Sequence, residues 1–157
     1  MNPSDLIETA SALLSPAGGK PTEASLRRAV SSAYYALFHC LAHECANLLI
    51  GGSGSDRSEA TWRQVYRALD HGPAKTKCKK REMIRKFPEE IQSFTKTFAD
   101  LQEKRHSADY DPFAQFTELD VSTNIAAVEA AISRFKSAPI KHRRAFCAYV
   151  LFKDRND

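Results

Sequence analysis

The sequence has 157 residues, a formal net charge of +4 and 43% hydrophobic residues, which suffices for one domain with a hydrophobic core. No run approaches the ~18 apolar residues of a transmembrane helix, and the N-terminus lacks the basic and apolar regions of a secretory signal. Four cysteines without C-x-x-C spacing favour reduced thiols over a disulfide framework or a structural zinc site. We therefore expect a cytoplasmic protein with no membrane contact and no cofactor.

Residues 3–14 are predicted to form a short amphipathic helix, with Asn2 or Ser4 as its N-cap. Gly and Pro in residues 15–19 end it. Residues 26–49 then form the longest strongly apolar segment without Gly or Pro, and its apolar residues recur with the period of a helix. Thr22 is the expected N-cap of this central helix.

A polar stripe lies opposite the apolar face of the central helix. The stripe consists of Arg28 and of the residues four, seven and eleven positions after it, Ser32, Tyr35 and His39. At this spacing all four fall on one narrow arc of the helix. A guanidinium, a hydroxyl, a phenol and an imidazole in one row suit a surface that binds phosphate. A mildly polar, solvated face is the alternative interpretation.

Three further helices are predicted at about residues 57–71, 88–107 and 117–137, the last with Thr117 as its N-cap. Short connections between them predict an all-α fold, an approximately five-helix, mostly antiparallel bundle over residues 1–138. Residues 139–157 form a basic and apolar extension. Its apolar run 145–152 is predicted to be a strand or a helical turn that packs on the bundle or on a second subunit.

Positive charge is concentrated in two segments. Residues 75–86 hold seven Lys or Arg against one Glu, and residues 139–157 hold five against two Asp. Such local charge is typical of a surface that faces a polyanion, although solvated basic loops are also common. The expected nucleic-acid contacts in the first segment are Lys75, Lys77, Lys79, Lys80 and Arg81.

His39 and His43 have the spacing of two metal ligands on one helix, with Cys40 and Glu44 beside them. No second cluster in the sequence supplies the remaining ligands. We therefore expect no metal site.

A second polar motif lies at the end of the predicted helix 88–107. If that helix continues to Tyr110, Arg105 and Asp109 are one turn apart and can pair. The segment KRHSADYDP, together with RRAVSSAYYALFH in the central helix, resembles the HEPN family (higher eukaryotes and prokaryotes nucleotide-binding domain). The resemblance spans roughly residues 5–137.

The resemblance implies a small helical bundle that forms homodimers. Many HEPN proteins are metal-independent endoribonucleases whose Arg-x(4–6)-His motifs meet at the dimer interface. Others bind nucleic acid or nucleotides without catalysis, or are adaptors. Some are toxins, with a small nucleotidyltransferase as antitoxin, which in some members adenylylates a tyrosine near the motif.

On this resemblance, Arg105 matches the motif arginine, and Tyr110 stands where the family has histidine. A phenol is a poor base near neutral pH, so His39 or His106 is the expected substitute, and Asp109 is expected to orient Arg105. Arg28 and Tyr35 are expected neighbours that contact RNA. The family also implies a twofold axis near Arg105. A non-catalytic binding or adaptor bundle is the alternative.

Overall fold

The computed structural model describes residues 1–154, and every regular element in that range is a helix. The all-α class is therefore confirmed, but the described residues form eight helices and not about five. The helices are α1 (Pro3–Leu14), α2 (Glu23–Leu49), α3 (Glu59–Ala68), α4 (His71–Cys78), α5 (Arg81–Ile84), α6 (Glu89–Tyr110), α7 (Glu118–Ser137) and α8 (Ile140–Leu151). None of them is long and apolar enough to cross a membrane.

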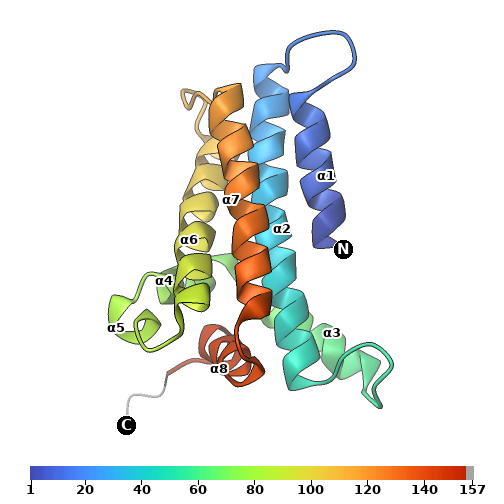
Figure 1. Ribbon diagram of the computed structural model, residues 1–157, viewed down its shortest axis with the longest axis vertical. Coiled ribbons are helices and arrows are strands. Elements are labelled where there is room, and N and C mark those ends of the chain that lie inside the picture. Colours follow the sequence, from blue (N-terminus) through green and yellow to red (C-terminus); the bar gives the residue numbers. More distant parts are fainter. Residues whose placement is uncertain (155–157) are drawn as a thin grey trace.

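Four long helices, α1, α2, α6 and α7, lie side by side and run alternately up and down (Figure 1). The other four helices, α3, α4, α5 and α8, gather at the lower end of this bundle in the same view. α2 touches the other three long helices as well as α3 and α8. Such a central position requires a helix that is apolar on more than one face.

The sequence of α2 meets this requirement with small and branched residues. Thr22 caps the helix as expected, because its Oγ1 accepts a hydrogen bond of 3.1 Å from the Ser25 N–H. Much of its surface is buried, and small side chains let the neighbouring helices approach closely. The buried residues of α2 are Leu26, Ala29, Val30, Ala33, Tyr34, Ala36, Leu37, Cys40, Leu41, Ala42, Cys45 and Ala46.

The additional helices arise from the two basic segments. α4 begins at His71, and Pro73 occupies its first turn, where a missing N–H costs no hydrogen bond. The apolar run 145–152 lies within α8 up to Leu151, so it is a helix and not a strand. Phe146 of α8 enters the core, with its ring centroid 5.9 Å from that of Phe135 and 6.5 Å from that of Phe94.

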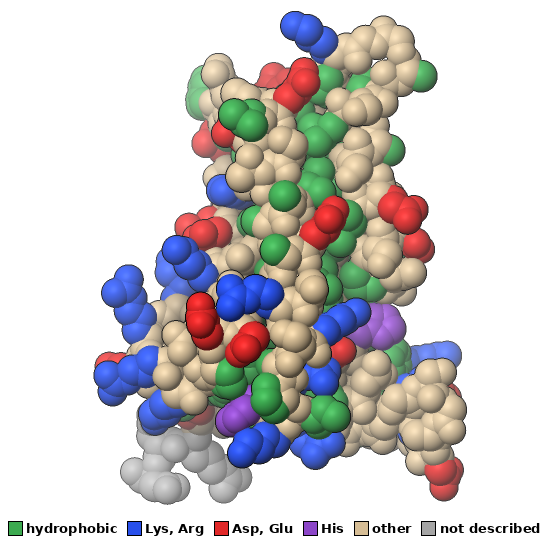
Figure 2. Space-filling model, in the orientation of Figure 1, with side chains coloured by type: hydrophobic (Ala, Val, Ile, Leu, Met, Phe, Trp, Pro, Cys, Tyr) green, Lys and Arg blue, Asp and Glu red, His purple; other side chains and the backbone are tan. Residues whose placement is uncertain are grey.

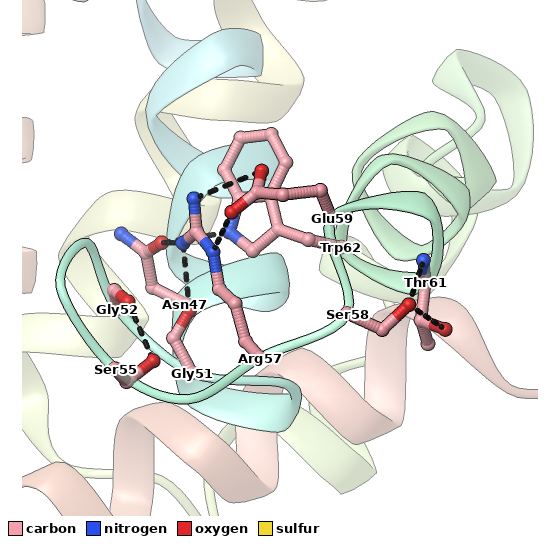
Figure 3. A network of polar contacts seen from close by, with 9 residues as sticks. All are labelled: Asn47, Gly51, Gly52, Ser55, Arg57, Ser58, Glu59, Thr61 and Trp62. Carbon is pink, nitrogen blue, oxygen red and sulfur yellow. Dashed lines mark hydrogen bonds and ion pairs between the residues drawn. The ribbon is translucent and has the colours of Figure 1, made fainter.

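Arg57 closes the glycine-rich loop between α2 and α3 (Figure 3). Its Nη1 donates to the Gly51 carbonyl at 2.8 Å, and its Nε donates to Glu59 at 2.8 Å. The guanidinium lies over the Trp62 ring, 4.8 Å from the centroid, and the indole N–H donates to Asn47 Oδ1 at 2.9 Å. These contacts give the glycine-rich loop between α2 and α3 a defined path.

Candidate functional site

Arg105 is a buried cation on α6. The residue is only 8% exposed, and its Nη1 lies 3.4 Å from Asp109 Oδ2, one helical turn further on. Its Cζ lies 5.3 Å from the ring centroid of Tyr34 and 6.0 Å from that of Tyr35, both on α2. Its Nε is buried without a hydrogen-bond partner among the described residues. Buried donors without a protein partner are uncommon, and this N–H is free to bind a water molecule or a ligand.

Asp109 links α6 to the central helix. Its Oδ1 accepts a hydrogen bond of 2.5 Å from Ser31 Oγ, while Oδ2 faces Arg105. Asp109 also lines a pocket of about 420 Å³ together with the predicted stripe residues Arg28, Ser32 and Tyr35, and with Leu6, Thr9, Leu13 and Ser31. Three of the four stripe residues thus meet Asp109 in one pocket between α1, α2 and α6, and Arg105 is not part of its lining.

Arg27 holds this place together, although the sequence pattern selected its neighbour Arg28. Its Nη1 donates to the carbonyls of Ala108 and Asp111 at 2.9 and 2.8 Å, and its Nη2 donates to that of Ala114 at 2.6 Å. These carbonyls belong to the end of α6 and the following loop, where helical partners are missing. Arg27 therefore fixes the helix end that carries Asp109.

His71 is a second residue that the sequence analysis missed. Its Nδ1 lies 2.6 Å from the hydroxyl of Tyr34, and its ring stacks on Phe38 with centroids 4.0 Å apart. Tyr34 is fully buried, and burial raises the pKa of its hydroxyl well above the usual value, so the phenol stays protonated. The direction of this hydrogen bond depends on the imidazole tautomer: the phenol donates to Nδ1 when the ring proton is on Nε2, and Nδ1–H donates to the phenol oxygen when it is not.

Arg105 and His71 approach the same two tyrosine rings. The His71 ring centroid lies 5.5 Å from that of Tyr34 and 5.9 Å from that of Tyr35, the rings over which the Arg105 guanidinium lies. Burial, and then the positive charge of Arg105, lower the pKa of His71. The imidazole is therefore neutral near pH 7, beside a permanent cation.

The other proposed bases lie elsewhere. His39 Nδ1 is hydrogen-bonded to the Tyr66 hydroxyl, and burial lowers the pKa of His39. His106 and Tyr110 lie near each other on the exposed side of α6, with ring centroids 5.0 Å apart, and Tyr110 is 68% exposed. No described contact joins these three residues to Arg105.

The lysines of the basic segment bind other parts of the protein. Lys75 and Lys79 lie 3.5 and 2.8 Å from Glu103, and Lys80 lies 3.7 Å from Asp154. Lys77 Nζ donates to the carbonyls of Tyr149, at 2.6 Å, and Phe152, where α8 ends. Arg81 has no such partner among the described residues and lines a separate cleft.

Within residues 1–154, no three His, Cys, Asp or Glu side chains are grouped closely enough to hold a metal ion. His39 and His43 instead belong to an aromatic stack with Tyr66 and Trp62, whose ring centroids lie 5.2 Å apart. The sequence as a whole has no significant match among protein-family models, curated proteins or solved structures.

Proposed function

We propose that this chain is a HEPN-like protein that acts on RNA, as a metal-independent endoribonuclease of a toxin–antitoxin or defence system. The observation that supports this best is the buried Arg105, which pairs with Asp109 of its own motif and lies over Tyr34 and Tyr35 of the other. A guanidinium in a poorly hydrated site stabilises phosphate charge more strongly than one in water.

Cleavage of RNA without a metal needs three groups. A base takes the proton of the ribose 2′-hydroxyl, whose oxygen attacks the adjacent phosphorus. A cation stabilises the phosphorane, and an acid protonates the 5′-oxygen as the P–O bond breaks. In our proposal Arg105 is the cation and Asp109 orients it, while Arg28 and Tyr35 hold the neighbouring phosphate. His71 serves as base and then as acid: with its Nδ1–H donated to the Tyr34 hydroxyl, the neutral imidazole takes the 2′-hydroxyl proton on Nε2, and the imidazolium so formed protonates the 5′-oxygen as the P–O bond breaks.

The test is a cleavage assay on single-stranded RNA in the presence of a chelator. Arg105→Ala should lower the rate by about 10²-fold or more, because one preorganised electrostatic contact is worth that much. His71→Gln should lower it by about 10²-fold, while His106→Gln, on the exposed side of α6, serves as the matched control. The assignment would be contradicted if Arg105→Ala left the rate of cleavage unchanged, or if the wild type cleaved no RNA at all.

Tyr110 is proposed as a modification site and not as a base. Its hydroxyl is accessible, since the side chain is 68% exposed near the end of α6. Phe113 and Leu119, exposed by 89% and 75%, follow it in the chain. These residues suit contact with a second subunit or with a nucleotidyltransferase antitoxin. Tyr110→Phe should leave cleavage unchanged and abolish any adenylylation seen by mass spectrometry when the two proteins are produced together.

A binding or adaptor protein without catalysis is the second candidate. The observation that favours it is the placement of His39, His106 and Tyr110, none of which contacts Arg105 among the described residues. In that case the wild type binds RNA or a protein partner, and no RNA is cut. The cleavage assay and light scattering, which reports the proposed homodimer, distinguish the two candidates.

A further inference from the structure

A cleft of about 680 Å³ lies between the basic segment and α6, apart from the Arg105 site. One wall is the end of α4 and the short helix α5, and the other is the first half of α6. Its volume is in the range of ligand-binding pockets. The residues that line it are Cys78, Lys79, Arg81, Ile84, Arg85, Gln92, Thr95, Lys96, Ala99 and Asp100.

The rim of this cleft is cationic. Arg81 and Arg85 on one wall and Lys96 on the other are exposed and pair with no acidic group among the described residues. Lys79 adds a fourth positive charge, which Glu103 compensates at 2.8 Å, and Asp100 is the acid in the lining. The space-filling view shows Lys and Arg gathered over this lower left part of the molecule (Figure 2). Of the three cations left for an external anion, only Arg81 is among the contacts expected from the sequence.

The floor of the cleft is apolar and fixed. Cys78, Ile84 and Ala99 are buried there. The polar groups beside them are already engaged, because Thr95 Oγ1 donates to the Gln92 carbonyl at 2.7 Å and Gln92 Nε2 donates to the Phe87 carbonyl at 2.7 Å. An apolar floor under a cationic rim suits a phosphodiester that carries a sugar and a base better than a bare inorganic anion.

We propose that this cleft binds the backbone of single-stranded RNA, with Arg81, Arg85 and Lys96 on its phosphates and a nucleoside on the apolar floor. The site is distinct from Arg105. Lys96 and Arg105 are nine residues apart on α6, which is about 13.5 Å and 2.5 turns, so their side chains leave opposite sides of the helix. Binding in this cleft therefore rests on the proposed function for its ligand, RNA, but involves none of the proposed catalytic residues.

The test measures binding of a fluorescently labelled oligouridine by the full chain at several salt concentrations. The triple variant Arg81→Ala, Arg85→Ala, Lys96→Ala should bind at least tenfold more weakly. The slope of log K against log[salt] should become shallower by about 2, since each phosphate contact on a single strand contributes about 0.7. The matched control is Arg63→Ala, Arg67→Ala, Lys141→Ala, which removes three exposed cations outside the cleft and should bind as the wild type does.

Equal losses in the two triple variants, or no loss in either, would overturn the proposal, because binding would then follow net charge alone. The proposal would also be overturned if polyglutamate competed as strongly as unlabelled RNA, since polyglutamate has no nucleobase to occupy the apolar floor. Circular dichroism checks that both variants fold. Arg105→Ala should retain cleft binding, so failure of the nuclease proposal and failure of this one are separate outcomes.

Discussion

Single arginines decide the geometry near the candidate site. Arg27 and Arg28 are adjacent in sequence, yet a helix places their side chains about 100° apart. Arg27 reaches four carbonyls at the end of α6 and in the next loop, whereas Arg28 is exposed and lines the pocket. The polar stripe identified Arg28 from spacing alone. It could not identify Arg27, because the carbonyls that Arg27 binds are about eighty residues away in the chain.

Arg27→Ala should destabilise the protein by about 1–3 kcal/mol, the value of hydrogen bonds from one charged group. The loss arises because four carbonyls lose their donor at a helix end, where no backbone N–H replaces it. Urea unfolding measures it, with Arg28→Ala as the neighbouring control, expected to stay within about 0.5 kcal/mol of the wild type. Equal stability of the two variants would show that the carbonyls are as well satisfied by water.

At the scale of the elements, helices with local start signals were predictable. Thr117 forms the expected capping box with Asp120, so the start of α7 was placed within a residue. α4 and α5 carry no comparable start signal, because neither has a side-chain hydrogen bond at its N-cap. Their formation depends on tertiary contacts such as that of Lys77 with the end of α8. His71 was missed for the same reason, since its partner Tyr34 is thirty-seven residues away.

The docking of α8 on α2 depends on an ion pair that is mostly removed from water. Arg143 Nη1 lies 2.8 Å from Glu44 Oε2, and each side chain is 15% exposed. Arg143→Ala should cost roughly 2 kcal/mol of unfolding free energy, because Glu44 is left half-buried and unpaired. Arg144→Ala, which removes an exposed hydrogen bond of 3.3 Å to Leu48, is the control and should change little.

If the Arg143→Ala loss came from the helix itself and not from the pair, adding Glu44→Gln to it would not restore stability. Recovery in the double variant, measured by the same urea unfolding, is therefore the expected outcome.

For the whole molecule, three histidines set the pH dependence of stability. Burial is the main cause that lowers the pKa values of His39, His43 and His71 in the folded state. The unfolded chain therefore binds more protons once the pH falls below about 6.5, the ordinary histidine pKa. Stability should be nearly constant between about pH 7 and 8, below the ordinary cysteine pKa, and decrease as the pH falls from about 6.5 towards the lowered folded pKa values.

Urea unfolding at pH 7.5, 6.5 and 5.5 measures this dependence, and His71→Gln should reduce it. The carboxyl groups with lowered pKa values, Glu59, Glu103 and Asp120, add their own loss of stability only at still lower pH. A protein that becomes more stable between pH 7.5 and 5.5 would contradict the burial of these imidazoles as neutral groups.

The position of Phe146 has a consequence for the order in which the chain can fold during synthesis. Its ring packs against Phe94 and Phe135, and it belongs to α8, which lies at the lower end of the bundle (Figure 1) and is made after the four long helices. While residues 1–138 emerge, the long helices can assemble, but these two rings have no cover from α8. At about 5–20 residues per second, the nascent bundle keeps an open apolar end for roughly a second or more before the twelve residues of α8 seal it.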